Sequence, residues 1–130
     1  MENTNKNPFT WVEIYVDDMH RAQRFYETVF AIQLIDLPTS EEMGDLQMKS
    51  FPWNNDQPNI SGALVKMDEI KAGAGGTMVY FECEDCATEE SRVEQAGGKV
   101  LQPKMPIGAY GFCSVVMDTE GNNIGLHSMK

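Results

Sequence analysis

Three side chains of this sequence are suited to acid–base or metal chemistry: the carboxylates of Glu13 and Glu82 and the imidazole of His127. Each stands in a run of alternating side chains typical of a β-strand, on the same face as one another by strand parity. Together they could hold a divalent metal ion, or Glu13 and His127 could act as acid and base without one. The structural alternatives are a hydrogen-bonded histidine near the chain end, favoured for His127, and an ion pair with a basic residue, left open for Glu13.

Apolar and aromatic side chains surround these polar groups in the predicted strands. Strand parity predicts that Trp11, Tyr15, Met78 and Tyr80 share the face of the acidic residues. Loops and neighbouring strands are expected to add walls from a second set: Phe51, Trp53, Tyr110 and Phe112. Such a lining binds organic molecules by stacking and burial, and it can hold a cation over its rings. Packing in the core is favoured for Phe51 and Phe112, and a place in the lining for both tryptophans.

The three cysteines favour a structural role. Cys83 and Cys86 form a C-x-x-C pair, but the residues between them are Glu84 and Asp85. Their negative charges would raise a thiol pKa and suppress the reactive thiolate. A zinc ribbon would need a second such pair, and the remaining Cys113 stands alone. An odd number of cysteines also fits a reducing compartment better than a disulfide framework.

Composition and charge limit the classes of partner. The chain has 130 residues, 42% of them hydrophobic, which suits one compact domain with a real core. A net charge of −10 and a pI near 4.5 disfavour nucleic acid and anionic membranes as partners. No apolar run approaches a membrane span or a signal peptide, so a cytoplasmic protein is expected. The acidic pairs 41–42 and 89–90 are interpreted as solvated faces.

The two halves of the sequence repeat one pattern. A strand that begins at Trp11 and ends on two acidic residues reappears from Met78, an offset of 67 residues between positions 11 and 78. Each copy then predicts a helix and three further strands, which gives two β-α-β-β-β modules. We expect a single domain with module one at about residues 8–70, a glycine-rich linker at about 71–76 and module two at about 77–130.

The expected elements follow from periodicity, caps and turn residues. In the first copy we predict a strand at 9–16, a helix at 19–30 capped by Asp18, and strands at 32–37, 47–51 and 60–67. In the second copy we predict a strand from residue 78, a helix at 86–96 that ends at two glycines, and a strand at 99–102. A loop at 103–109 then leads to a strand at 110–117, a tight turn at 118–122 and a last strand at 123–128.

Four short motifs follow one another along the chain: V-D-D-M at 16–19, A-Q-R-F-Y-E at 22–27, G-G-K-V at 97–100 and D-T-E-G-N at 118–122. In this order they resemble the vicinal oxygen chelate superfamily, which contains glyoxalase I, extradiol dioxygenases and bleomycin-resistance proteins. The resemblance implies an α+β fold in which the curved mixed sheets of the two modules form a cup, often completed by dimerisation. In the enzymes of the family it also implies a divalent metal held by His and Glu side chains.

The positions that match the family's metal ligands hold no suitable donor. They are occupied by Trp11 and Met78 at the starts of the two modules, by Gly125 after the tight turn, and by residues 62–64 in the fourth place. Divalent metals need several converging N or O donors, so we expect neither a metal nor another cofactor. Glu13 and His127 each lie two residues from such a position, or roughly 7 Å along a strand, so a shifted site would have to be displaced by that much.

These observations favour a metal-free small-molecule binding protein that holds a cationic or aromatic ligand in an aromatic-lined cup. The ligand-binding residues expected are Trp11, Glu13, Tyr15, Trp53, Met78, Tyr80, Glu82, Tyr110 and His127. The alternative is a glyoxalase-type lyase or isomerase that uses Glu13, Glu82 and His127 as a shifted metal or acid–base site. A third alternative is a partner-binding module with a filled cup. The resemblance also implies a homodimer.

Overall fold

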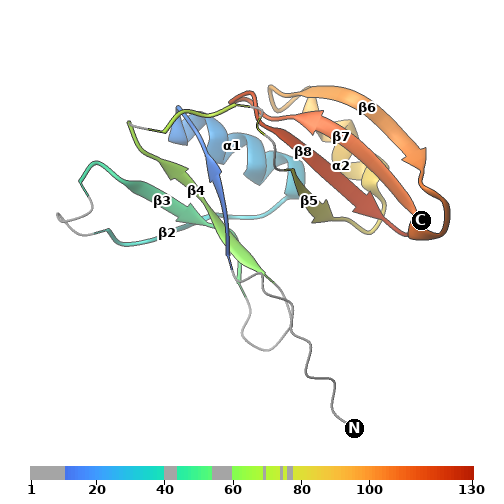
Figure 1. Ribbon diagram of the computed structural model, residues 1–130, viewed down its shortest axis with the longest axis horizontal. Coiled ribbons are helices and arrows are strands. Elements are labelled where there is room, and N and C mark those ends of the chain that lie inside the picture. The colour runs from blue at the N-terminus through green and yellow to red at the C-terminus, as the bar shows by residue number, and fades with distance from the viewer. Residues whose placement is uncertain (1–10, 40–43, 54–59, 69, 74, 76–77) are drawn as a thin grey trace, which may run out of the picture.

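The computed structural model of the protein describes residues 11–39, 44–53, 60–68, 70–73, 75 and 78–130. Within them the chain forms two four-stranded mixed sheets and two α-helices (Figure 1). The strand order is β1-β4-β3-β2 in the first sheet and β5-β8-β7-β6 in the second. The same order therefore occurs twice, and the predicted α+β fold of two β-α-β-β-β modules is confirmed.

Each sheet begins with a parallel pair. In the first sheet, β1 (Trp11–Tyr15) lies parallel to β4 (Ser61–Lys66), and β3 (Gln47–Ser50) and β2 (Ile35–Asp36) follow antiparallel. In the second sheet, β5 (Val79–Glu82) lies parallel to β8 (Asn123–Ser128), and β7 (Phe112–Met117) and β6 (Lys99–Pro106) follow antiparallel. A 3₁₀ turn at Gly108–Tyr110 joins β6 to β7.

The first helix, α1 (Met19–Phe30), has the bounds that the sequence predicts. Asp18 caps it, because its carboxylate accepts a hydrogen bond of 3.0 Å from the backbone N–H of Arg21. The helix ends at Ala31, whose left-handed backbone (φ 54°) lets its N–H donate to the carbonyl of Glu27. The apolar side chains that recur at three- and four-residue spacing on one face of α1 are mostly buried, and Phe25 and Tyr26 are fully buried.

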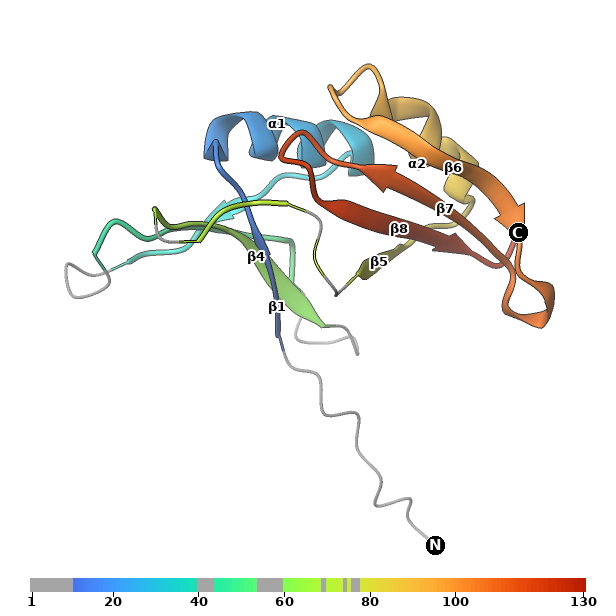
Figure 2. The same cartoon turned by 45° about the horizontal axis from the view of Figure 1, so that its top comes forward.

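The second helix, α2 (Cys86–Val93), packs against β6, β7 and β8, and α1 packs against α2 and β4. Figure 2 shows both helices on the same side of the two sheets. Strand parity places Ile14 and Val16 toward the helices, where they are buried, and Trp11 on the opposite face, where it is 40% exposed. The other face of each sheet therefore carries no helix among the described residues. Neither described helix has the length and apolar composition needed to cross a membrane.

The predicted elements differ from the structure around β2, where only Ile35–Asp36 of the predicted strand at 32–37 forms, and around β6. We predict a short strand and then a loop at 103–109, but the strand continues to Pro106. Two irregularities in its pairing with β7 accompany this extension. Proline is tolerated because β6 is the outermost strand of its sheet, where an amide N–H is not needed on the open side. The helix α2 also ends earlier than predicted, at Val93, and the chain then passes through turns to Gly97, whose φ is +96°.

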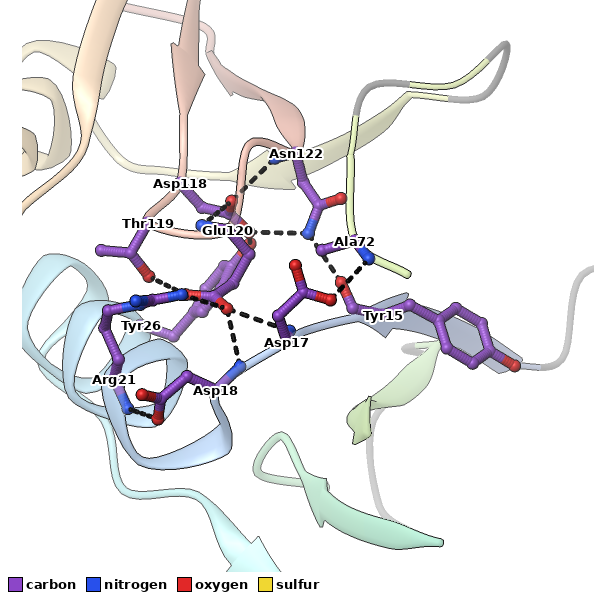
Figure 3. Close-up of polar contacts among 10 residues, drawn as sticks. All are labelled: Tyr15, Asp17, Asp18, Arg21, Tyr26, Ala72, Asp118, Thr119, Glu120 and Asn122. Carbon is purple, nitrogen blue, oxygen red and sulfur yellow. Dashed lines mark hydrogen bonds and ion pairs between the residues drawn. The ribbon is translucent and has the colours of Figure 1, made fainter. Parts of the chain in front are cut away.

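The turn between β7 and β8 connects the second module to the first (Figure 3). Glu120 in this turn accepts hydrogen bonds from the backbone N–H groups of Asp17 (3.0 Å) and Asp18 (2.8 Å). The guanidinium of Arg21 donates to both oxygens of the same carboxylate, at 2.7 Å from Nε and 2.9 Å from Nη2. The Glu120 side chain is fully buried. A charged group of the second module thus accepts the hydrogen bonds of the backbone N–H groups just before α1 in the first.

Asp118 is the second anchor of this turn. Its buried carboxylate accepts hydrogen bonds from the hydroxyl of Tyr26 (2.7 Å) and from the backbone N–H groups of Glu120 and Asn122 (both 2.8 Å). The amide of Asn122 in turn donates to the carbonyl of Tyr15 at 2.9 Å. Burial and the neighbouring Asp118 carboxylate raise the pKa of Tyr26 well above its usual value, so its hydroxyl stays protonated. The turn thus fixes how the two modules are oriented.

Candidate functional site

A pocket of about 910 Å³ lies between the two modules. The first module contributes residues from β1, the end of α1 and the start of β4, and the second contributes residues from β5 and α2. The lining consists of Val12, Ile14, Phe30, Ile32, Phe51, Pro52, Ile60, Ser61, Gly62, Val79, Tyr80, Phe81, Glu82 and Glu89. The pocket therefore depends on the module orientation that the β7–β8 turn fixes.

Three phenylalanine rings form the apolar wall of the pocket. The centroids of Phe30 and Phe81 lie 4.6 Å apart, and those of Phe51 and Phe81 lie 5.6 Å apart. The buried ring of Tyr26 supports them from behind, with an edge contact of 5.6 Å to Phe51. Separations of this size are typical of favourable aromatic pairs. Phe51 packs against the core, as predicted, and also lines the pocket.

Polar atoms in this lining lack partners. Ser61 is only 8% exposed, and its Oγ has no hydrogen-bond partner in the part of the chain that the structure describes. The same holds for Oε1 of Glu89, a buried atom of a half-buried side chain. A buried polar atom without a partner costs about 1–3 kcal/mol, so each such atom in a pocket indicates a place for a ligand or for water.

The sequence did not indicate either residue. We interpreted residues 89–90 as a solvated face, and this is wrong for both: Glu89 lines the pocket, and Glu90 accepts a hydrogen bond of 2.6 Å from the backbone N–H of Lys104. A signal was present, because Glu89 follows Cys86 by three residues and precedes Val93 by four, the spacing of the buried face of α2. For Ser61 the sequence holds no comparable signal.

The thiol of Cys83 lies beside Glu89. Burial first, and then the neighbouring Glu89 carboxylate, raise the pKa of this thiol to about 12. All three cysteines are buried and none forms a disulfide. The predicted direction of the shift is therefore correct, but its causes are burial and Glu89, not Glu84 and Asp85.

The predicted residues of β1 form a group of their own. Glu13 accepts hydrogen bonds from Trp11 Nε1 (3.1 Å) and from the hydroxyl of Tyr15 (2.7 Å), and all three groups are accessible to solvent. The hydrogen bond to Glu13 raises the pKa of Tyr15. Glu13 is thus satisfied by neighbours on its own strand, and none of the described ion pairs involves it. Glu13 and Tyr15 also line a second pocket of about 240 Å³.

Tyr80 occupies the space next to Gly125, one of the positions that match a family metal ligand. The two residues are opposite each other on β5 and β8, and a Cβ atom added to Gly125 would lie 2.3 Å from Cδ1 of the Tyr80 ring. A larger side chain at position 125 therefore cannot coexist with this ring in its present place. Although it covers Gly125, the Tyr80 side chain is still 54% exposed and lines the larger pocket.

The remaining predicted site residues are dispersed. Glu82 lines the pocket between the modules and pairs in register with the half-buried His127 of β8. Met78 and Trp53 are 36% and 65% exposed, and neither is part of the pocket lining. Tyr110 ends the 3₁₀ turn, and its side chain lies outside the described part of the structure.

The described residues do not fit the metal chemistry of the enzymes in the family. No three His, Cys, Asp or Glu side chains within them are close enough together to hold a metal ion. Glu13, Glu82 and His127 are all among the described residues, so they do not form the shifted site that we considered. The arrangement offers instead an apolar pocket with a few hydrogen-bond acceptors.

Comparisons with known proteins agree with this architecture. Residues 8–48 match a family model described as bleomycin resistance protein-like N-terminal. A glyoxalase-related enzyme from Fulvimarina pelagi superposes with a TM-score of 0.72 at 14% identity, over 95% of this chain and 88% of that one. This chain has the glyoxalase/bleomycin resistance/dioxygenase fold. The resemblance inferred from the sequence is confirmed at this level.

Other solved structures share the glyoxalase/bleomycin resistance/dioxygenase fold with this chain. A superfamily member from Sphaerobacter thermophilus has a TM-score of 0.68 at 15% identity, over 95% of this chain and 98% of that one. Glyoxalase I from Zea mays has a TM-score of 0.70 at 16% identity, over 92% of this chain but only 45% of its own length, so the present chain spans about half of the maize enzyme. No curated protein matches the sequence.

Proposed function

We propose that this chain is a small-molecule binding protein that holds an aromatic, cationic ligand in the pocket between its two modules, without a metal ion. The observation that carries the proposal is a pocket with an aromatic wall and two carboxylates, Glu82 and Glu89, in its lining. The pocket volume of about 910 Å³ falls in the range of known small-molecule sites, roughly 300–1,000 Å³.

Charge supports a cationic ligand. The described lining contains no Lys, Arg or His, and neither Glu82 nor Glu89 takes part in any of the described ion pairs. Negative groups in an apolar surround attract a positive charge more strongly than they would in water. The net charge of −10 acts in the same direction at long range.

The proposal is tested by calorimetric titration with two compounds that share one aromatic body, 1-naphthylmethylamine and 1-naphthalenemethanol. We expect binding of the amine at a single site. Ile60, which lines the pocket and is 45% exposed, allows a lysine to be added at its edge. Ile60→Lys should weaken binding of the amine by about fivefold or more through like-charge repulsion.

Ile70→Lys is the matched control, since Ile70 is also exposed (39%) but does not line the pocket. Binding should be unchanged in this variant. The proposal is wrong if the amine does not bind, if the neutral alcohol binds as tightly as the amine, or if both variants weaken binding equally.

The alternative function, a glyoxalase-type lyase or isomerase, would need Glu13 to act together with His127, with or without Glu82. Glu13 lies on β1 of the first sheet, whereas Glu82 and His127 pair in register on β5 and β8 of the second, and the three do not form a group that could hold a metal ion, so we do not propose this function. Metal analysis of the purified protein tests this choice directly. Retention of one divalent metal per chain, with loss of structure or turnover on its removal, would overturn the metal-free proposal.

We further propose that the chain assembles as a homodimer, as the resemblance implies. Several large apolar side chains on the helix-free faces of the sheets support this, because they would otherwise remain in water. They are Trp11, Ile35, Tyr80 and Met105, each between 38% and 54% exposed. Sedimentation equilibrium at micromolar concentration measures the assembly state, and a monomer would contradict the proposal.

A further inference from the structure

The polar atoms of the pocket between the modules determine more than the sign of the ligand's charge. We propose that the ligand is a primary or secondary ammonium compound with an aromatic body, and that its N–H groups donate hydrogen bonds to Glu89 Oε1 and Ser61 Oγ. This inference rests on the proposed function and specifies the chemistry of the same site.

The first step is the balance of donors and acceptors. The carboxylate of Glu89 only accepts hydrogen bonds, and the Ser61 hydroxyl can accept as well as donate. Both Glu89 Oε1 and Ser61 Oγ are buried and without partners among the described residues, and both residues line the pocket. A ligand that brings N–H donors would therefore satisfy atoms that are otherwise desolvated at a cost.

The second step concerns the other neighbours of Glu89. The described residues include no basic side chain paired with it, and the thiol of Cys83 beside it stays protonated because its pKa is raised to about 12. A neutral thiol can donate one weak hydrogen bond but cannot balance a negative charge. A positively charged donor from the ligand would supply that balance.

The third step separates ammonium ions from quaternary cations. A quaternary ammonium group can lie over aromatic rings, but it has no N–H to donate. It would leave Glu89 Oε1 and Ser61 Oγ unsatisfied while covering them from water. Sites with buried hydrogen-bonding groups discriminate strongly against analogues that lack the matching group. The pocket should therefore prefer an ammonium ion over the trimethylated form of the same molecule.

The experiment compares three ligands by calorimetry: 1-naphthylmethylamine, its N,N,N-trimethyl derivative and 1-naphthalenemethanol. We expect the amine to bind about 10-fold or more tightly than either of the others, as for hydrogen bonds to a charged group. Glu89→Gln should remove most of the preference over the neutral alcohol, because the amide keeps the shape of the side chain but loses its charge. It should also reduce the preference over the trimethyl derivative, because a neutral amide oxygen is a weaker hydrogen-bond acceptor than a carboxylate. Ser61→Ala should reduce the affinity for the amine more than that for the trimethyl derivative.

Glu94→Gln is the matched control, because Glu94 is an exposed residue just beyond the end of the same helix and does not line the pocket. It should leave all three affinities unchanged. Equal binding of the amine and its trimethyl derivative, or an undiminished preference in Glu89→Gln, would overturn this inference while the proposed function stands. Equal binding of the neutral alcohol as well would overturn both. Binding of none of them would overturn the proposed function itself. Circular dichroism of each variant establishes that it is folded.

Discussion

Replacing Glu120 by Gln should weaken the contact between the two modules and lower the free energy of unfolding, although the two side chains have almost the same shape. The carboxylate accepts two backbone hydrogen bonds from Asp17 and Asp18, two from Arg21 and one of 2.8 Å from the hydroxyl of Thr119. An amide offers only one acceptor oxygen, and its NH₂ group would face donors. The substitution therefore removes the negative charge. It also places an N–H donor where at least one existing hydrogen bond needs an acceptor.

The magnitude follows from the pKa of the carboxyl group. Burial alone would raise this pKa, but the hydrogen bonds from Arg21, Asp18, Thr119 and Asp17 outweigh it and lower the pKa from 4.5 to about 2. Such a difference between folded and unfolded chains corresponds to about 3 kcal/mol of folding free energy. The Arg21 side chain is 47% exposed, so part of its contribution is screened by water, and this value is an upper limit. For a domain of this size it would lower the Tm by roughly 10 °C.

The sign of the pH dependence is also fixed. Because the pKa of Glu120 is lowered in the folded protein, its stabilisation is complete above about pH 4.5 and is lost as the pH falls toward 2. Urea unfolding, followed by tryptophan fluorescence at pH 7 and pH 3, should show a difference between wild type and Glu120→Gln that shrinks at the lower pH. Glu94→Gln, on an exposed position, should match wild type at both pH values. A difference below about 1 kcal/mol at pH 7, or one that does not change with pH, would refute this reasoning.

Two further predictions concern single contacts. Gly125→Ala should lower the free energy of unfolding by about 1–3 kcal/mol, because the added Cβ forces the Tyr80 ring from its place. This cost should largely disappear in a Tyr80→Ala background. Urea unfolding of the wild type, the two single variants and the double variant measures it, and an equal cost in both backgrounds would assign it to the backbone instead. Cys83, with its pKa raised to about 12, should resist thiol reagents at pH 8 until the protein unfolds; mass spectrometry of the labelled peptides tests this, and rapid modification of the native protein at Cys83 would contradict it.

Much of the fold could be predicted from local signals. The helix at Met19–Phe30 and the strand at Asn123–Ser128 have the predicted bounds, because caps, turn residues and apolar periodicity agree there. The length of β6 could not be predicted, since Pro103 reads as a loop residue unless the strand is known to lie at a sheet edge. Edge position is a property of the assembled sheet and leaves no local trace in the sequence.

The candidate site was predicted less completely. Strand parity correctly separates the face of Trp11 from the buried face of Ile14, but it does not specify the angle at which one module packs against the other. The larger pocket forms at that junction and combines Tyr80 and Glu82 with residues of the opposite face, such as Val12 and Phe81. The angle between the modules depends on contacts between residues about one hundred positions apart, such as Asp18 with Glu120. Periodicity within a strand or helix contains no information on such contacts.

The hydrogen bonds of Glu120 to Asp17 and Asp18 also bear on how the chain matures during synthesis. These amides start the first helix, yet their acceptor is translated 102 to 103 residues later. When only the amino-terminal half has been synthesised, the amides of Asp17 and Asp18 therefore lack the carboxylate that accepts their hydrogen bonds in the folded protein. Long-range closure of this kind slows folding and delays it until most of the polypeptide has emerged. We therefore expect the two halves to fold as a single cooperative unit after the β7–β8 turn has been synthesised.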